Sequence, residues 1–243
     1  YALPGAIELN HARRCSVEQV ELRAIGGYGI VGSAFEEGRI IGCRFEDIGG
    51  GGIRLSGSAS LIASNVIARI GLDHAGAVAI SAHHPIASRD TNGMRIVRNV
   101  ISDGSYSGIV LSGADHVVEE NVIERVMRDL HDGAAIYGGV QRTAIRRNVV
   151  RDVVAIGPGY GVSAYYLDEG AEQCIVERNV SIGVERPTHN HMTRNNVIRD
   201  NLFIASSNMV LSFVRSAHCE FTGNTLILSG ALQIASPTAI SRW

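Results

Sequence analysis

The segment EENVIERV at residues 119–126 decides the fold, because its pattern, an Asn set in a short apolar run, recurs along most of the chain. The further copies are ASNVIARI at 63–70, VRNVISDG at 97–104, RRNVVRDV at 146–153, ERNVSIGV at 177–184, RDNLFIAS at 199–206 and TGNTLILS at 222–229. An earlier copy, IGCRFEDI at 41–48, has Cys43 in the place of the Asn. This recurrence indicates an internal structural repeat.

The spacing of the copies gives the length of one repeat. The equivalent positions are Cys43, Asn65, Asn99, Asn121, Asn148, Asn179, Asn201 and Asn224. Successive positions are 22, 34, 22, 27, 31, 22 and 23 residues apart, so 22 recurs and is never undercut. We interpret 22 residues as a structural period that insertions lengthen in three places.

Each repeat holds two or three short runs rich in Val and Ile, separated by turns rich in Gly, and no helical periodicity appears. This pattern predicts an all-β fold in which three strands and three turns make one coil of a parallel β-helix. Equivalent residues of successive coils then lie about 4.8 Å apart, so the repeated asparagines form a ladder of amides. We expect one solenoid domain over residues 1–243.

The composition excludes several classes of function. The formal net charge of −2 gives no electrostatic basis for binding nucleic acid or a membrane surface, so we predict neither partner. All 22 basic residues are arginine, so no lysine is available to form a Schiff base or to act as a general base. The cysteines lack a CxxC motif, and we expect Cys43 and Cys174 to be buried free thiols.

No apolar run is long enough to span a membrane, and no signal peptide is visible. The chain begins at Tyr1 inside a repeat-like segment, from which we expect a processed chain or a part of a longer protein. These features leave the compartment open.

Insertions into a solenoid tend to emerge on one face, which is often the binding face. Relative to the 22-residue period, 12 extra residues fall near 71–93, five near 126–133 and nine near 154–161. We therefore expect the working surface near these three segments.

Three neighbouring coils carry an unusual number of side chains that can do chemistry. These are Asp129, His131, Asp132 and Tyr137 in the first coil, Tyr165, Tyr166, Asp168 and Glu169 in the second, and His189, Asn190 and His191 in the third. Counting back 11 positions from each Asn predicts that Tyr137, Asp168 and Asn190 stack in one row. On the same count His191 stacks on Glu169, and His189 stacks on Leu167.

A pair of carboxylates on adjacent coils has a natural chemistry. The coil rise is close to the ~5–5.5 Å carboxyl separation of retaining glycosidases, and inverting enzymes use ~6.5–9.5 Å. Two carboxylates so close repel each other when both are charged, which leaves one acid and one base or nucleophile. Asp132 and Asp168 are the two candidates, with Glu169 as a further acid or base.

The runs DGAAIYGG at 132–139 and YLDEG at 166–170, followed by HNHMTRNN at 189–196, resemble right-handed parallel β-helix proteins of the pectate-lyase-like superfamily. The group named by this resemblance is glycoside hydrolase family 141, whose earlier coils are similar to GGGGIRLSG at 49–57. The resemblance implies a right-handed β-helix that hydrolyses a polysaccharide or oligosaccharide in an extracellular or periplasmic location. By the same resemblance, Asp132 and Asp168 are the proposed catalytic pair.

The remaining candidates are predicted to bind substrate. They are Tyr106, His131, Tyr137, Tyr166, His189 and His191. Each has a plainer interpretation: half-buried strand tyrosines are common, surface histidines are common, and Asp-Gly is a strong turn signal that accounts for Asp132 equally well. No third ligand accompanies the two histidines of the HNH run, so we predict no metal and no other cofactor.

Two other functions fit the same residues. The first is elimination or C5-epimerisation of a uronic acid polysaccharide, because DLHD at 129–132 weakly resembles the Asp-Pro-His-Asp motif of mannuronan epimerases. That chemistry needs a base, an acid and a cation, roles open to His131, Tyr137 and an arginine. The second is a non-catalytic β-helix that binds glycans or serves a structural purpose.

Overall fold

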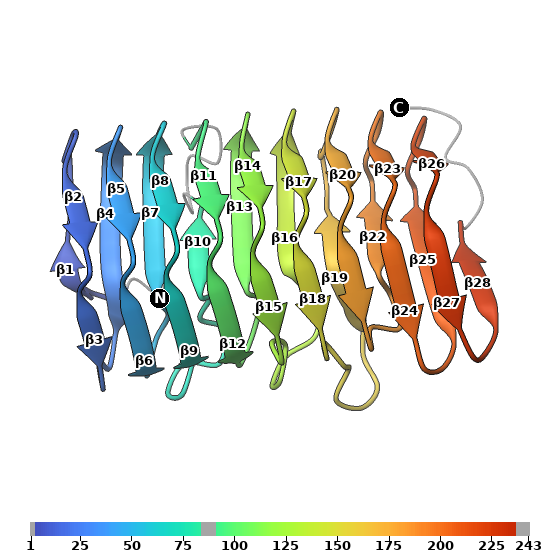
Figure 1. Ribbon diagram of the computed structural model, residues 1–243, viewed down its shortest axis with the longest axis horizontal. Helices are drawn as coiled ribbons and strands as arrows, with labels where there is room; N and C mark the ends of the chain where they lie inside the picture. Colours follow the sequence, from blue (N-terminus) through green and yellow to red (C-terminus); the bar gives the residue numbers. More distant parts are fainter. Residues whose placement is uncertain (1–2, 84–90, 237–243) are drawn as a thin grey trace.

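The computed structural model describes residues 3–83 and 91–236. In this part of the chain every element of secondary structure is a β-strand. The strands form three sheets that wind into one solenoid (Figure 1). Every strand pair is parallel, and each strand pairs with its equivalent one coil away. The predicted all-β parallel β-helix is confirmed.

The first sheet contains β1 (Gly5–Glu8), β4 (Tyr28–Glu36), β7 (Ile53–Ser58), β10 (Ile80–Ala82), β13 (Ile109–Ala114), β16 (Gly133–Gln141), β19 (Val162–Leu167), β22 (Thr188–His191), β25 (Met209–Val214) and β28 (Leu232–Ala235). The second contains β2 (Ser16–Glu18), β5 (Arg39–Ile41), β8 (Leu61–Ala63), β11 (Arg95–Val97), β14 (Val117–Glu119), β17 (Ala144–Arg146), β20 (Ile175–Glu177), β23 (Val197–Arg199) and β26 (Glu220–Thr222). The third contains β3 (Glu21–Arg23), β6 (Arg44–Ile48), β9 (Val66–Ile70), β12 (Val100–Gly104), β15 (Val122–Glu124), β18 (Val149–Arg151), β21 (Val180–Ile182), β24 (Leu202–Ala205) and β27 (Thr225–Leu228).

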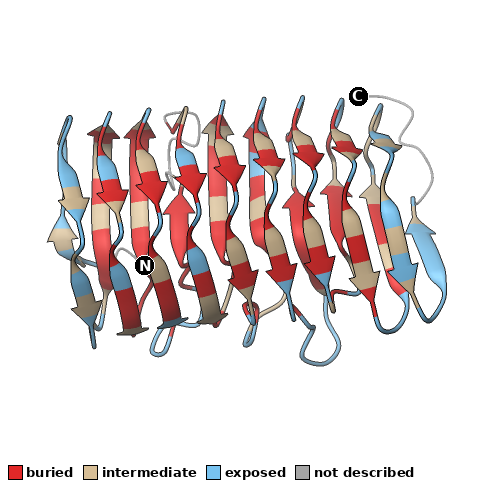
Figure 2. Ribbon diagram, in the orientation of Figure 1, coloured by how far each residue is buried: buried red, intermediate tan, exposed pale blue. Residues whose placement is uncertain are grey.

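The core lies inside the three sheets and is built from stacked rows of apolar side chains. In the first sheet the register places Ile30, Ile53, Ile80, Ile109 and Ile136 directly above one another, and all five are fully buried. Burying such a side chain contributes about 1.5–3 kcal/mol. Exposed residues gather at the turns and in the last strand, β28 (Figure 2).

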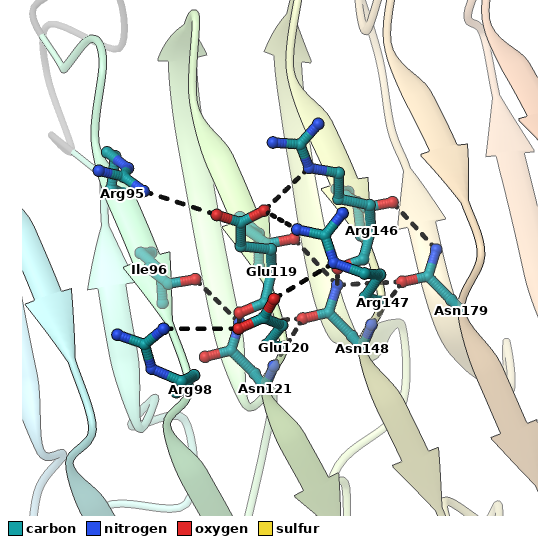
Figure 3. Close-up of polar contacts among 12 residues, drawn as sticks. Arg95, Ile96, Arg98, Glu119, Glu120, Asn121, Arg146, Arg147, Asn148 and Asn179 are labelled. Atoms are coloured by element: carbon teal, nitrogen blue, oxygen red, sulfur yellow. Dashed lines mark hydrogen bonds and ion pairs between the residues drawn. The ribbon is translucent and has the colours of Figure 1, made fainter.

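The repeated asparagines form a continuous ladder along the turn between the second and third sheets. The backbone N–H and the Nδ2 of Asn99 both donate to Oδ1 of Asn121 at 2.9 Å, and Nδ2 also donates to the carbonyl of Ile62 at 3.0 Å. The same pattern runs through Asn121, Asn148 and Asn179 (Figure 3). Each buried amide thereby has partners for its donors and its acceptor.

Cys43 fits the first rung of this ladder. Its backbone N–H donates to Oδ1 of Asn65 at 2.9 Å, as a ladder Asn would, and its thiol lies 3.5 Å from the carbonyl of Val17. Cys43 and Cys174 are buried free thiols, as expected, while Cys15 is exposed and free.

The turn that carries the ladder is short because the residue before each Asn has a left-handed backbone. The φ angles are 57° at Ser64, 54° at Arg98, 58° at Glu120, 55° at Arg147 and 54° at Arg178. A single residue in this conformation bends the chain between two strands, and the ladder amide holds the bend in place. Such a conformation costs a residue with a Cβ atom roughly 1–2 kcal/mol, which the hydrogen bonds of the turn must offset.

A charged row reinforces the second sheet on its outer face. Glu119, Arg146, Glu177 and Arg199 occupy one register, so opposite charges alternate from coil to coil. The carboxylate of Glu119 accepts from Arg146 at 2.9 Å and from Arg147 at 2.5 Å (Figure 3). Burial opposes ionisation of Glu119, but the arginines together hold the pKa of its carboxyl below the ordinary value.

The insertions fall mainly on one edge of the solenoid, as expected. The segments 71–79, 125–132 and 152–161 all connect the third sheet to the first. The long 71–93 interval is divided, however: Ile53 pairs with Ile80, 27 positions later and five more than the period, so the other seven extra residues lie between β10 and β11. Residues 84–90 of that stretch lie outside the described residues.

Replacing Asn148 with Ala tests the ladder. The change removes the acceptor for both the backbone N–H and the Nδ2 of Asn121, and the donor to the carbonyl of Val118. Because these groups are buried, we expect a loss of about 2–5 kcal/mol in the free energy of unfolding. Urea denaturation followed by circular dichroism measures it.

Asn224→Ala is the matched comparison, because Asn224 makes the same contacts to Asn201 but is only half-buried. Water can replace its hydrogen bonds, so the loss should be clearly smaller. Equal losses at the two rungs would contradict the view that burial gives the ladder its strength.

Candidate functional site

A row of rings stands on the outer face of the first sheet. Tyr137 of β16, Tyr166 of β19, His189 of β22 and Ser212 of β25 occupy one register. The ring centroids of Tyr137 and Tyr166 are 4.8 Å apart, and those of Tyr166 and His189 are 4.2 Å apart. Nδ1 of His189 lies 2.7 Å from the hydroxyl of Ser212. Side chains alternate along a strand, so these four point away from the core.

The predicted row of Tyr137, Asp168 and Asn190 is wrong. Tyr137 pairs with Tyr166, and Asn190 pairs with Leu167 and is fully buried. His189 therefore stacks on Tyr166 and not on Leu167.

The error arises in the turn after β19. Gly138 pairs with Leu167, but Gln141 pairs with Glu172, so this turn holds two more residues than its equivalent. Asp168 lies in this turn, beyond the strand that carries the row. For the same reason the expected stacking of His191 on Glu169 is not found: His191 contacts Asp168.

Asp168 accepts hydrogen bonds on both of its carboxylate oxygens. The hydroxyl of Tyr137 donates to Oδ2 at 2.6 Å, and Nδ1 of His191 lies 3.0 Å from Oδ1. The side chains of Asp168 and His191 are each 19% exposed, so the pair lies at the surface but is shielded on most sides. The two contacts fix the orientation of the carboxylate.

Asp132 approaches the same cluster from the turn before β16. Its φ is 56°, its N–H donates to the carbonyl of Gly161 at 3.0 Å, and its own carbonyl accepts from the hydroxyl of Tyr106 at 2.7 Å. Burial, then the charge of Asp132, then that of Asp168 raise the pKa of Tyr106. Tyr106 thus lies within electrostatic range of both aspartates, which belong to adjacent coils.

The other phenols of the cluster also stay protonated. Burial, the hydrogen bond to Asp168 and the charge of Asp168 raise the pKa of Tyr137. Burial and then the charge of Asp168 raise the pKa of Tyr166. Tyr137 is thus a fixed donor to Asp168 over the range in which proteins work.

His189 is held neutral. Burial, the charge of Arg186 and the charge of His191 lower its pKa to about 3, against the opposite effect of Asp168. Its Nε2 lies 3.3 Å from the hydroxyl of Tyr160, and its side chain is nearly fully buried. His189 and Tyr166, both predicted to bind substrate, are therefore placed to support the cluster from beneath.

Two residues of the cluster were missed from the sequence. Tyr160, in the inserted segment, places its ring 5.7 Å from that of His189, and the guanidinium of Arg186 lies 5.5 Å from the Tyr160 ring centroid. The long interval between Asn148 and Asn179 indicated the inserted segment that contains Tyr160, but no pattern distinguished Tyr160 within it. No signal pointed to Arg186, because it lies in an interval of the plain 22-residue length.

Two predicted residues lie apart from the cluster. Nε2 of His131 lies 3.2 Å from the carbonyl of Ile156, which ties this side chain to the inserted segment. Glu169 is exposed and borders a groove of about 840 Å³ together with Glu172, Arg194 and His218. The groove follows the opposite edge of the first sheet.

The sequence matches the model of the right-handed β-helix region over residues 5–179 and again over 84–238. The chain belongs to the right-handed β-helix family. The predicted handedness is thereby confirmed. A comparison with curated protein sequences finds no match.

Solved structures share this fold at low sequence identity. A glycoside hydrolase has 18% identity and a TM-score of 0.63 over 93% of this chain and 38% of its own. PfbA, a surface adhesin of Streptococcus pneumoniae, has 12% identity and a TM-score of 0.70 over 95% and 64%. The alginate lyase of Paenibacillus sp. str. FPU-7 has 15% identity and a TM-score of 0.58 over 91% and 99%.

These likenesses show the fold, which an adhesin and enzymes of different reaction types have in common, and the site must be judged on its own residues. The chain spans less than two thirds of the length of the hydrolase and of the adhesin. Among the described residues, no three His, Cys, Asp or Glu side chains gather into a group that could hold a metal ion. The same residues contain no helix long and apolar enough to cross a membrane.

The lowered pKa of His189 predicts a pH effect on stability. The ordinary pKa is 6.5 and the folded value is about 3, so between these values the unfolded chain holds a proton that the folded chain does not. Stability therefore falls as the pH falls through this window, by up to about 1.4 kcal/mol per pH unit. His189→Gln should remove this part of the acid sensitivity, measured by thermal unfolding from about pH 7 to about pH 4.

His218→Gln serves as the control, because His218 is exposed and distant in register from the ring row. It should follow the wild-type pH dependence. If His189→Gln and the wild type lose stability in parallel, the neutral state of buried His189 is not what makes the fold sensitive to acid.

Proposed function

We propose that this chain cleaves a glycosidic bond in a polysaccharide or oligosaccharide, with Asp132 and Asp168 as the catalytic pair. The observation that supports the proposal is that Asp132 and Asp168, from adjacent coils, border one tyrosine cluster: the Tyr106 hydroxyl donates to the main-chain carbonyl of Asp132, and the Tyr137 hydroxyl donates to the carboxylate of Asp168. Most glycosidases use two carboxyl groups, one on either side of the scissile bond.

The surroundings of the two residues suggest different roles. Tyr137 and His191 contact the two oxygens of Asp168 and hold its carboxylate in one orientation, which suits a base or nucleophile. Asp132 is fixed through its backbone N–H and C=O, and its exposed carboxyl is free to reach a bound sugar, so the proposal assigns it the second carboxyl role, that of the acid.

In the proposed reaction Asp132 donates a proton to the glycosidic oxygen as the bond to the anomeric carbon breaks. Asp168 either attacks that carbon or takes a proton from the water that does so. On the first route, water then breaks the bond between the sugar and Asp168 and gives a proton back to Asp132. On the second, the proton taken by Asp168 passes through solvent to Asp132, and on both routes water supplies the new hydroxyl.

The aromatic side chains supply a surface for the sugar. Tyr106 and Tyr137 are half-buried and Tyr160 is exposed, so their rings can contact the apolar face of a pyranose. His191 lies beside Asp168 and can bond to a sugar hydroxyl through Nε2, since Nδ1 faces the carboxylate.

Asp132→Asn and Asp168→Asn test the catalytic pair. Each change keeps the shape of the side chain but removes its acid or base function, so we expect kcat to fall by roughly 10²–10⁴-fold. The assay is release of reducing sugar from a panel of aryl glycosides and polysaccharides. The anomeric form of the first product, read by NMR, distinguishes retention from inversion.

Asp115→Asn is the matched control, because Asp115 is an exposed carboxylate paired with Arg142 on the far edge of the first sheet. It should retain full activity. Glu169→Gln is a third arm: a loss there with activity retained in Asp132→Asn would make Glu169 the second carboxyl group.

Other outcomes identify the competing functions. An unsaturated product that absorbs in the ultraviolet would indicate elimination instead of hydrolysis. Deuterium uptake at C5 without cleavage would indicate epimerisation. Glycan binding without turnover across the whole panel would favour a non-catalytic β-helix.

A further inference from the structure

The outer face of the third sheet carries a row of aliphatic side chains beside the asparagine ladder. The register stacks six residues, each of which directly follows a ladder Asn in the chain: Val66, Val100, Val122, Val149, Val180 and Leu202. They point outward, because the residue after each of them, such as Ile101 after Val100, is fully buried in the core. Val100 is 43% exposed, and the other five are partly exposed.

The outward row on the other side of the ladder is charged. On the second sheet, Arg146 pairs with Glu119 and Arg199 pairs with Glu177. The preference of β-strands for valine applies to both sides of the ladder, so it does not by itself explain an aliphatic row on one side.

A second outward row of the third sheet lies two positions further along each strand. It contains Glu124 on β15 and Arg151 on β18, followed by Ile182 and Ile204 on the next two strands. Nη2 of Arg151 lies 3.4 Å from the carboxylate of Glu124, and their side chains are 45% and 21% exposed. The third-sheet strip, meaning both rows from β9 to β24, is therefore mainly aliphatic with one pair of opposite charges in its middle.

This strip is complementary to itself. Three residues of the aliphatic row precede the midpoint between β15 and β18, and three follow it. A two-fold axis that runs along the strands through this midpoint reverses the order of the coils but keeps the position along each strand. The aliphatic row of one copy then meets that of another, and Glu124 of each copy lies opposite Arg151 of the other.

The charges at the turn that carries the ladder are mixed under the same rotation. Glu120 lies opposite Arg147 of the other copy, but Arg98 lies opposite Arg178. Arg98 is already 3.6 Å from Glu120 of its own chain. Exposed charges at the rim of an interface contribute little to affinity, so the strip itself must supply most of it.

We propose that the third-sheet strip is the interface of a homodimer, in which two copies of this chain pack face to face about this two-fold axis. The aliphatic row is about 24 Å long at a rise of ~4.8 Å per coil, and the strands of the strip lie side by side along the solenoid (Figure 1). These strands have only three to five residues each. The buried area therefore lies near the lower limit of about 1,200 Å² for a specific interface, and the dimer should dissociate on dilution.

The proposed dimer does not depend on the proposed function. The ring row of Tyr137, Tyr166 and His189 stands on the first sheet, so a contact through the third sheet leaves it uncovered.

Sedimentation velocity over about a hundredfold range of protein concentration tests the dimer, with a midpoint expected in the micromolar range. Glu124→Arg or Arg151→Glu alone places like charges opposite each other across the axis, so each should weaken dimerisation at least about tenfold. An equal mixture of the two variant proteins should restore it, because each contact across the axis again joins opposite charges. Asp115→Arg, an exposed change on the turn between the first and second sheets, is the control and should dimerise like the wild type.

Val100→Lys tests the aliphatic row. A charge at this exposed position can stay in water in one copy, but in the dimer it lies opposite Val180, so dimerisation should weaken roughly tenfold or more. Leu72→Lys is the matched control, because Leu72 is 61% exposed and lies outside the strip.

A monomer at every concentration would overturn the proposal, and so would a dimer that neither charge reversal weakens. Failure of the mixture to restore dimerisation would rule out the two-fold arrangement. Growth to masses above that of a dimer would show a different, open-ended contact between copies, because a two-fold contact closes.

Discussion

Coil-to-coil hydrogen bonding at the asparagine ladder is the constraint on which the rest of this structure depends. Each amide accepts two hydrogen bonds from the preceding rung and donates to the following one, as Asn121 does between Asn99 and Asn148. A buried turn with a left-handed residue would otherwise leave polar groups without partners. Cys43 keeps part of this pattern: its backbone N–H bonds to Asn65, and a weak thiol donor stands where the amide would be.

Because the ladder fixes the register at the turn between the second and third sheets, extra residues enter the chain at the other turns. Extra residues enter mainly between the third and first sheets, so the segments at 125–132 and 152–161 lie together over one edge of the first sheet. Those segments bring Asp132 and Tyr160 to the ring row on β16, β19 and β22. The site is thus assembled from a rigid row of stacked rings and from loops that the ladder allows to vary.

Electrostatics distinguishes this face from the rest of the solenoid. On the second sheet, carboxylates such as Glu119 are paired with arginines and serve the stability of the fold. On the first sheet, the partners of Asp168 are Tyr137 and His191, which are neutral donors or titratable groups. Neighbours with this fold include an adhesin as well as enzymes, so it is this difference in pairing, and not the architecture, that argues for chemistry.

The sequence was enough to predict the parallel solenoid, its period and the ladder positions, because each ladder Asn must meet its equivalent one coil away. It also predicted that Asp132, Asp168, Tyr137 and His191 lie near one another, and hydrogen bonds join Asp168 to Tyr137 and His191. Only the tertiary structure decided the order within that neighbourhood. Tyr137 pairs with Tyr166, 29 positions later and seven more than the period, which leaves two of the nine extra residues for the turn after β19. The positions of two ladder asparagines give the total number of residues between them, but only local packing decides how those residues are divided between the turns. That division brings Arg186 and Tyr160 to the site.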